Sequence, residues 1–155
     1  MKKIKCIESE ELKMKKNMSK ETNWIIHYVA DKFACSLEER EFAFSPYICD
    51  AHTHGLIENY NHPEFQVVLD LGDSRIAFLL YRLGSMVKEG RRFKSGDLVS
   101  GIITDYDLQL FELADDAGKM LRVIIPDKNH HFPEDLNCEF PYCLQYMDKE
   151  ELSAN

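Results

Sequence analysis

The apolar residues between positions 73 and 90 recur at steps of three and four, and this spacing constrains the fold more than any other feature. The residues of this stripe are Ile76, Leu79, Leu80, Leu83, Met86 and Val87. On a helix they would all lie on one face, which must be buried against another element. Asp73 or Ser74 can cap the start of such a helix, and Gly90 can end it. The pattern therefore predicts one long amphipathic helix over residues 74–89.

Short segments rich in β-branched and aromatic residues surround this helix and predict strands. They cover residues 24–29, 47–56, 65–69, 98–103, 106–113 and 120–125. Helical spacing through Phe33 leaves the first of them open between strand and helix. We expect a turn or short helix at 37–40, an extended stretch around Phe42 and Phe44, and a connection at 58–61. The order predicts an α+β fold, with a mostly antiparallel sheet packed on the long helix and smaller helices elsewhere.

Charge divides the chain into two unequal parts. The first 20 residues hold seven Lys and three Glu, a net charge of +4, so the remaining 135 residues carry −12. We expect residues 1–20 to be a charged, poorly ordered extension and residues 21–155 to form a single α+β domain. An acidic domain without a long basic stripe repels phosphate backbones, so nucleic-acid binding is disfavoured.

Cysteine usage and hydropathy predict a cytoplasmic protein. Five cysteines is an odd number, and their irregular spacing is typical of reduced thiols. The start of the chain shows no apolar segment of the kind that a secretory signal needs. The apolar runs are too short for a membrane span, so a membrane partner is not expected.

Several short motifs occur in an order that resembles the bacterial domain-of-unknown-function family 4262. They are Thr53-His54-Gly55-Leu56, His62-Pro63-Glu64 before a strand, the helix from Ile76 to Gly90, Gly96-Asp97, the Leu121–Asp127 strand ending in Pro-Asp, and Phe132-Pro133. The resemblance covers residues 22–145. It implies an α+β fold in a bacterial cytoplasmic setting, with no established reaction. In the family an aromatic residue often precedes the Thr and an aliphatic one follows it, whereas this chain has histidines in both places, so the family pattern does not require a metal site.

Residues 50–64 hold three of the six histidines and predict the candidate functional site: His52, His54, His62 and Glu64. In a strand, His52 and His54 would point to the same face with their Cα atoms about 7 Å apart, which suits two ligands of one metal ion. His62 would complete the set if the chain folds back, and zinc would suit such ligands. Asp50 would lie about 13 Å from His54, too far to share the ion unless the strand bends.

A structural interpretation of the same residues stays open. His52 and His54 can be polar residues at a strand edge, and His62 before Pro63 can begin a strand or cap a loop. Cys49 beside His52 could form a nucleophile–base pair, although a buried thiol is the commoner role of such a cysteine. The chain lacks the motifs of serine hydrolases, P-loop proteins and dinucleotide-binding enzymes.

Three hypotheses about function follow. The first, which we prefer, is a small cytoplasmic binding or interaction protein, regulatory or immunity-like, whose partner is a protein or a small molecule. The second is a metal- or His-dependent enzyme that acts on a small substrate at His52, His54 and His62. The third is a ligand-sensing module with a pocket between sheet and helix. Self-association through a sheet edge is compatible with each of them.

Overall fold

A computed structural model describes residues 23–30, 47–113, 118–148 and 151–152. The predicted extension 1–20 and the predictions at 37–40, Phe42 and Phe44 lie outside these residues. The described elements are β1 (Ile25–Ala30), β2 (Ile48–His54), α3 (Leu56–Tyr60), β3 (Glu64–Leu69), α4 (Asp73–Lys88), β4 (Leu98–Ile103), β5 (Tyr106–Phe111), β6 (Met120–Ile124) and the short 3-10 helix η3 (Tyr142–Leu144).

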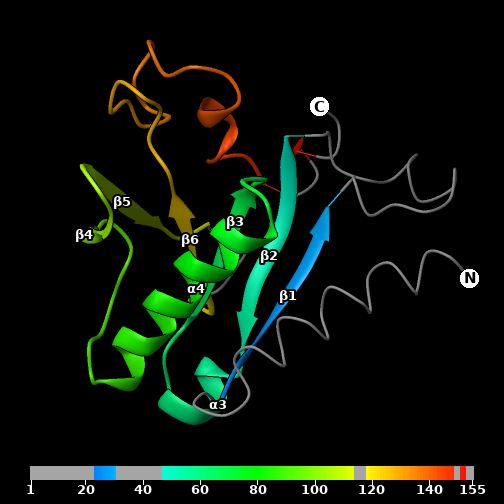
Figure 1. Ribbon diagram of the computed structural model, residues 1–155, viewed down its shortest axis with the longest axis vertical. Coiled ribbons are helices and arrows are strands. Elements are labelled where there is room, and N and C mark those ends of the chain that lie inside the picture. Colours follow the sequence, from blue (N-terminus) through cyan, green and yellow to red (C-terminus); the bar gives the residue numbers. More distant parts are fainter. Residues whose placement is uncertain (1–22, 31–46, 114–117, 149–150, 153–155) are drawn as a thin grey trace, which may run out of the picture.

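The strands form one six-stranded sheet in the order β1-β2-β3-β6-β5-β4. All neighbours are antiparallel except β3 and β6, which pair in parallel near the middle. The predicted α+β class and mostly antiparallel sheet are thus confirmed. Figure 1 shows α4 crossing in front of β3 and β6, with the β4–β5 hairpin on one side and β1 on the other.

Alternation along the strands divides buried side chains between the two faces of the sheet. On one face, Phe65 and Val67 of β3 share a buried apolar cluster with Leu80 and Leu83 of α4. On the other face, Ile48 and Val68 cluster with Leu144 and Leu152 near the end of the chain. All six residues of β3 are buried, as expected for a central strand covered on both sides.

Two local predictions were wrong and one open choice is settled. Residues 58–61, predicted as a connection, largely belong to α3. The N-cap of α4 is Gly72, not Asp73 or Ser74; its φ of 92° turns the chain in a way that glycine adopts without strain, so Asp73 already stands in the first turn. The segment at 24–34 is strand over its described part, because β1 runs to Ala30.

Helix α4 ends at Lys88, shortly before Gly90, the glycine that the sequence predicted would end it. Gly90 has a φ of 108°, and its N–H donates to the carbonyl of Val87 while the N–H of Arg91 donates to the carbonyl of Met86, each at 3.0 Å. This pair of bonds is the Schellman arrangement, which satisfies carbonyls that the helix leaves open. No helix in the described part of the chain combines the length and the apolar composition that crossing a membrane requires.

Trp24, just before β1, packs directly on the backbone of α4 at Gly84. A Cβ atom at residue 84 would lie 2.5 Å from Cε2 and Cζ2 of the indole ring. The indole also lies beside Tyr60 and Tyr81, at ring-centroid distances of 6.2 and 6.3 Å. The close approach of β1 to α4 therefore depends on the missing side chain at Gly84.

We predict that Gly84→Ala lowers the free energy of unfolding by about 1–3 kcal/mol, because the new methyl group overpacks against the ring of Trp24. The measurement is urea denaturation followed by tryptophan fluorescence and circular dichroism. Ser85→Ala, the next residue of the same helix, serves as control and should change stability by about 0.5 kcal/mol at most. Equal stability of the two variants would contradict the packing.

Candidate functional site

The carboxylate of Glu64 joins β2, α3 and β3. It accepts hydrogen bonds from the hydroxyl of Thr53 at 2.8 Å and from the backbone N–H groups of Gly55, Leu56 and Ile57, each at 3.1 Å. These N–H groups lie at the start of α3 and have no acceptor within the helix. A buried carboxylate at this position stabilises the helix start, so Glu64 has a structural task in this fold.

The imidazole of His62 is buried and uses both of its nitrogens. Nδ1 lies 2.8 Å from the carbonyl of Pro63, and Nε2 accepts the N–H of Phe93 at 3.0 Å. This pattern assigns a neutral ring with its proton on Nδ1. Burial lowers the pKa of His62, which favours the same neutral form. The ring packs against Phe65 and Phe93, at centroid distances of 5.3 and 6.0 Å, and thereby ties the segment after α4 to the core.

His52 and His54 of β2 lie beside a third histidine, His27 of β1. The ring of His27 is 5.3 Å from each of the other two rings, measured between centroids. His52 and His27 are cross-strand partners, and Nδ1 of His52 lies 3.1 Å from Oδ1 of Asp50. Sequence reasoning missed His27 because only the register of β1 on β2 places it there.

The predicted ligand set is not assembled. In the segments that the structure describes, no group of three or more His, Cys, Asp or Glu side chains is arranged to hold a metal ion. His52 and His54 alternate with Ala51, a residue of the main core, so they face away from it. His62 is packed inside that core, and its two nitrogens are already engaged. The described residues thus do not bring His62 together with His52 and His54, and a metal site at these residues stays a prediction.

Neither Cys49 nor Cys138 is arranged as a nucleophile. Cys49 is buried, and its thiol donates to the carbonyl of Val67 at 3.6 Å, as the buried-thiol interpretation expects. Burial, followed by the nearby charge of Asp127, raises the pKa of the Cys138 thiol to about 11. A thiol of this kind carries little reactive thiolate at neutral pH.

A pocket of about 560 Å³ opens between α4, the β4–β5 hairpin and the segment that follows β6. We call it the hairpin pocket. Its apolar lining residues are Leu71, Phe78, Leu79, Ile102, Ile103, Ile125, Pro126 and Tyr142, and its polar ones are Ser74, Arg75, Tyr106, Asp127 and Lys128. The volume and the mostly apolar walls are those of a site for a small molecule.

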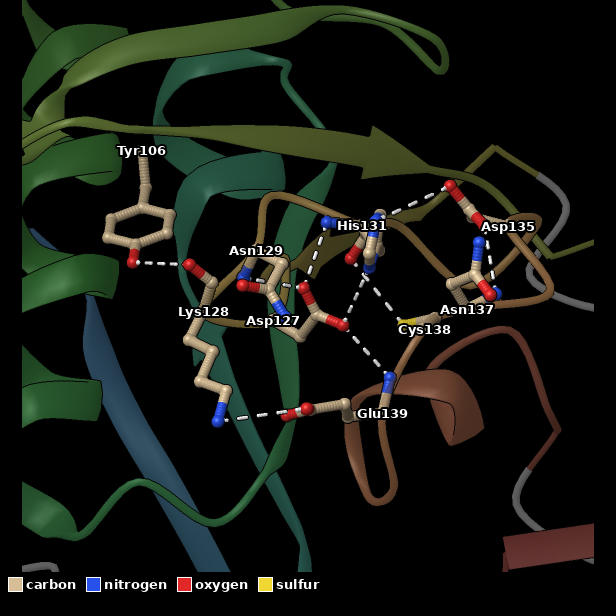
Figure 2. A network of polar contacts seen from close by, with 9 residues as sticks. All are labelled: Tyr106, Asp127, Lys128, Asn129, His131, Asp135, Asn137, Cys138 and Glu139. Carbon is tan, nitrogen blue, oxygen red and sulfur yellow. Dashed lines mark hydrogen bonds and ion pairs between the residues drawn. The ribbon is translucent and has the colours of Figure 1, made fainter.

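The buried carboxylate of Asp127 holds one wall of the hairpin pocket in place, and Figure 2 shows the contacts that this carboxylate makes. Its Oδ1 accepts the N–H groups of Asn129 and His131, and its Oδ2 accepts the N–H of Glu139, all at 2.9 Å. Nδ1 of His131 adds a fourth contact to Oδ2 at 3.2 Å. Burial would raise the pKa of Asp127, but these hydrogen bonds outweigh it and lower the pKa to about 2.

The polar residues that line the pocket differ in whether they form hydrogen bonds or ion pairs with other protein groups. The ammonium of Lys128 lies 3.8 Å from the carboxylate of Glu139, and the carbonyl of Lys128 accepts the hydroxyl of Tyr106 at 3.0 Å (Figure 2). Arg75 and Ser74 stand in the first turn of α4 and are exposed. The sequence signalled this region only through its Pro-Asp pair at 126–127.

Comparisons with known proteins do not extend this description: no family model, no curated protein and no solved structure matches the chain. The resemblance to family 4262 therefore stays a prediction. The geometry of the described residues carries the functional argument.

We predict that Glu64→Gln lowers the free energy of unfolding by about 3 kcal/mol, because an amide can no longer accept from four buried donors. Urea denaturation measures the change. Glu58→Gln, at an exposed position in the first turn of α3, is the control and should cost less than about 1 kcal/mol. If both variants lose the same small amount, the carboxylate does not fix the start of α3.

A second prediction concerns pH. Because the pKa of Asp127 falls from an ordinary 3.8 to about 2 on folding, its ionised form stabilises the folded state fully above a pH of about 4, and this stabilisation is lost as pH falls toward 2. The difference in unfolding free energy between wild type and Asp127→Asn should therefore be constant above that range and shrink below it. Denaturant titrations at a series of pH values measure it, with exposed Asp107→Asn as control. A difference that does not change with pH would contradict the prediction.

Proposed function

We propose that this chain is a binding protein that holds a small, largely apolar molecule in the hairpin pocket. The observation that carries the proposal is the cavity of about 560 Å³, whose walls come mostly from apolar side chains. Such cavities bury most of the surface of a small ligand, and the removal of that apolar surface from water supplies the binding energy. In this proposal α4 acts as the long amphipathic helix that packs on the sheet and also provides one pocket wall.

The alternative of a His-dependent enzyme receives less support from two of the predicted site residues, His62 and Glu64. Both nitrogens of His62 are hydrogen-bonded, and the carboxylate of Glu64 accepts from four donors. A general base must reach the proton that it removes, and these two groups face protein atoms instead. We therefore favour binding over catalysis, in a small cytoplasmic protein with a regulatory or immunity-like role.

The pocket also supports the third sequence hypothesis, a ligand-sensing module. Phe78 on α4 is 51% exposed although it lines the cavity. A bound molecule would cover part of this ring, so occupancy would change the surface that a partner protein meets. We propose sensing of this kind, in which the small molecule alters an exposed face of α4.

The test is titration with N-phenyl-1-naphthylamine, an uncharged probe that fluoresces in apolar sites. We expect saturable binding with a Kd on the order of 100 µM or tighter, as roughly 0.3 kcal/mol per heavy atom implies. Ile103→Trp should weaken this binding about tenfold or more, since the indole would occupy the cavity. Ser100→Trp, at an exposed position of the same strand, is the matched control. Absence of saturable binding, or equal binding by both variants, would sink the proposal.

A further inference from the structure

We propose that the ligand of the hairpin pocket carries an anionic group and that Arg75 binds this group at the pocket entrance. The inferred ligand class is a small molecule with an apolar body and one carboxylate, sulfonate or similar anion. This inference rests on the proposed binding function and adds the chemistry of the ligand to it.

Arg75 lines the cavity, and its guanidinium has no hydrogen-bond or ion-pair partner among the described residues. Arg122, by contrast, is buried and donates to a side chain and to two carbonyls. A guanidinium offers five N–H donors in a planar fork that matches a carboxylate or sulfonate. The donors of Arg75, unpaired within the described part of the chain, are therefore suited to an anion.

The other two charged residues that line the pocket, Asp127 and Lys128, each have a partner among the described residues. Glu139 lies 3.8 Å from the ammonium of Lys128, and Figure 2 shows the side chain of Lys128 extended toward Glu139. Asp127 accepts four hydrogen bonds, two on each carboxylate oxygen. Asp73, two residues before Arg75, accepts the N–H of Ser74 at 2.9 Å. Arg75 is thus the charged lining residue for which we find no such partner among the described residues.

An apolar surface lies next to this cation. Phe78 follows Arg75 by three residues on α4, so the two side chains emerge on the same side of the helix, and both line the cavity. The ring is half exposed at the entrance, where the body of an amphiphilic ligand would cover it. The chain as a whole carries a net charge of −8, which repels anions in general. Selection of an anion therefore requires a local cation such as Arg75.

The experiment compares two fluorescent probes that differ chiefly in one charge. The sulfonate 8-anilinonaphthalene-1-sulfonate and the uncharged N-phenyl-1-naphthylamine are each titrated into wild type, Ile103→Trp, Arg75→Gln and Arg82→Gln. Arg82 is exposed on the same helix and does not line the cavity, so its variant controls for the loss of one positive charge. We expect Arg75→Gln to weaken binding of the sulfonate about tenfold, as for one charge-assisted contact. Binding of the uncharged probe should change by less than about twofold, and Arg82→Gln should affect neither probe.

The possible failures are distinguishable. If Ile103→Trp blocks both probes but Arg75→Gln affects neither, or weakens both equally, the anionic class is wrong while the binding function stands. The same conclusion follows if Arg82→Gln weakens the sulfonate as much as Arg75→Gln does. If Ile103→Trp leaves both probes bound as in wild type, the probes bind outside the hairpin pocket, and both proposals are overturned. Circular dichroism of each variant confirms that the exposed substitutions leave the fold unchanged.

Discussion

The guanidinium of Arg122 lies in the middle of the sheet with 1% of the residue exposed, and the surrounding structure has to satisfy it. A buried charge without hydrogen-bond partners would cost several kcal/mol. Its Nε donates to Oε1 of Gln66 at 3.0 Å, and the amide of Gln66 donates to Asp50 at the same distance. Its Nη1 donates to the carbonyls of Gln145 and Met147. Arg122 thus links β6 directly to β3 and to the segment near the end of the chain, and through Gln66 it also links to β2.

The same segment supports the hairpin pocket. The side chain of Gln145 accepts the N–H of Ile125 at 2.8 Å and donates to the carbonyls of Ile125 and Tyr142, at 2.6 and 2.9 Å. Ile125 and Tyr142 line the pocket, and Asp127 fixes the chain two residues beyond Ile125. The wall opposite α4 is therefore held by hydrogen bonds before any ligand arrives. A preorganised wall reduces the entropy lost on binding, because few side chains remain to be ordered.

Local patterns were enough for the fold class but not for features that depend on distant residues. The β-branched and aromatic residues at 65–69, 98–103 and 106–113 predicted strands that are present. The five-residue helix α3 is too short to be stable alone; it depends on Glu64 and on Gly55, whose φ is 123°. The parallel pairing of β3 with β6 joins residues 56 positions apart, and the hairpin pocket is built from four separate segments. Neither leaves a periodic signal in the sequence.

The histidines illustrate why a chemical residue type is weak evidence for a site. A sequence shows which groups are present but not which of them the fold has already paired. His62 belonged to the densest cluster of coordinating residues, yet the carbonyl of Pro63 and the N–H of Phe93 take both of its nitrogens. Arg75 attracted no attention in the sequence, yet it borders a cavity without a partner among the described residues. A polar group is available for binding only where the protein leaves its hydrogen-bonding capacity unused, and by this criterion the hairpin pocket is a better candidate than the histidine segment.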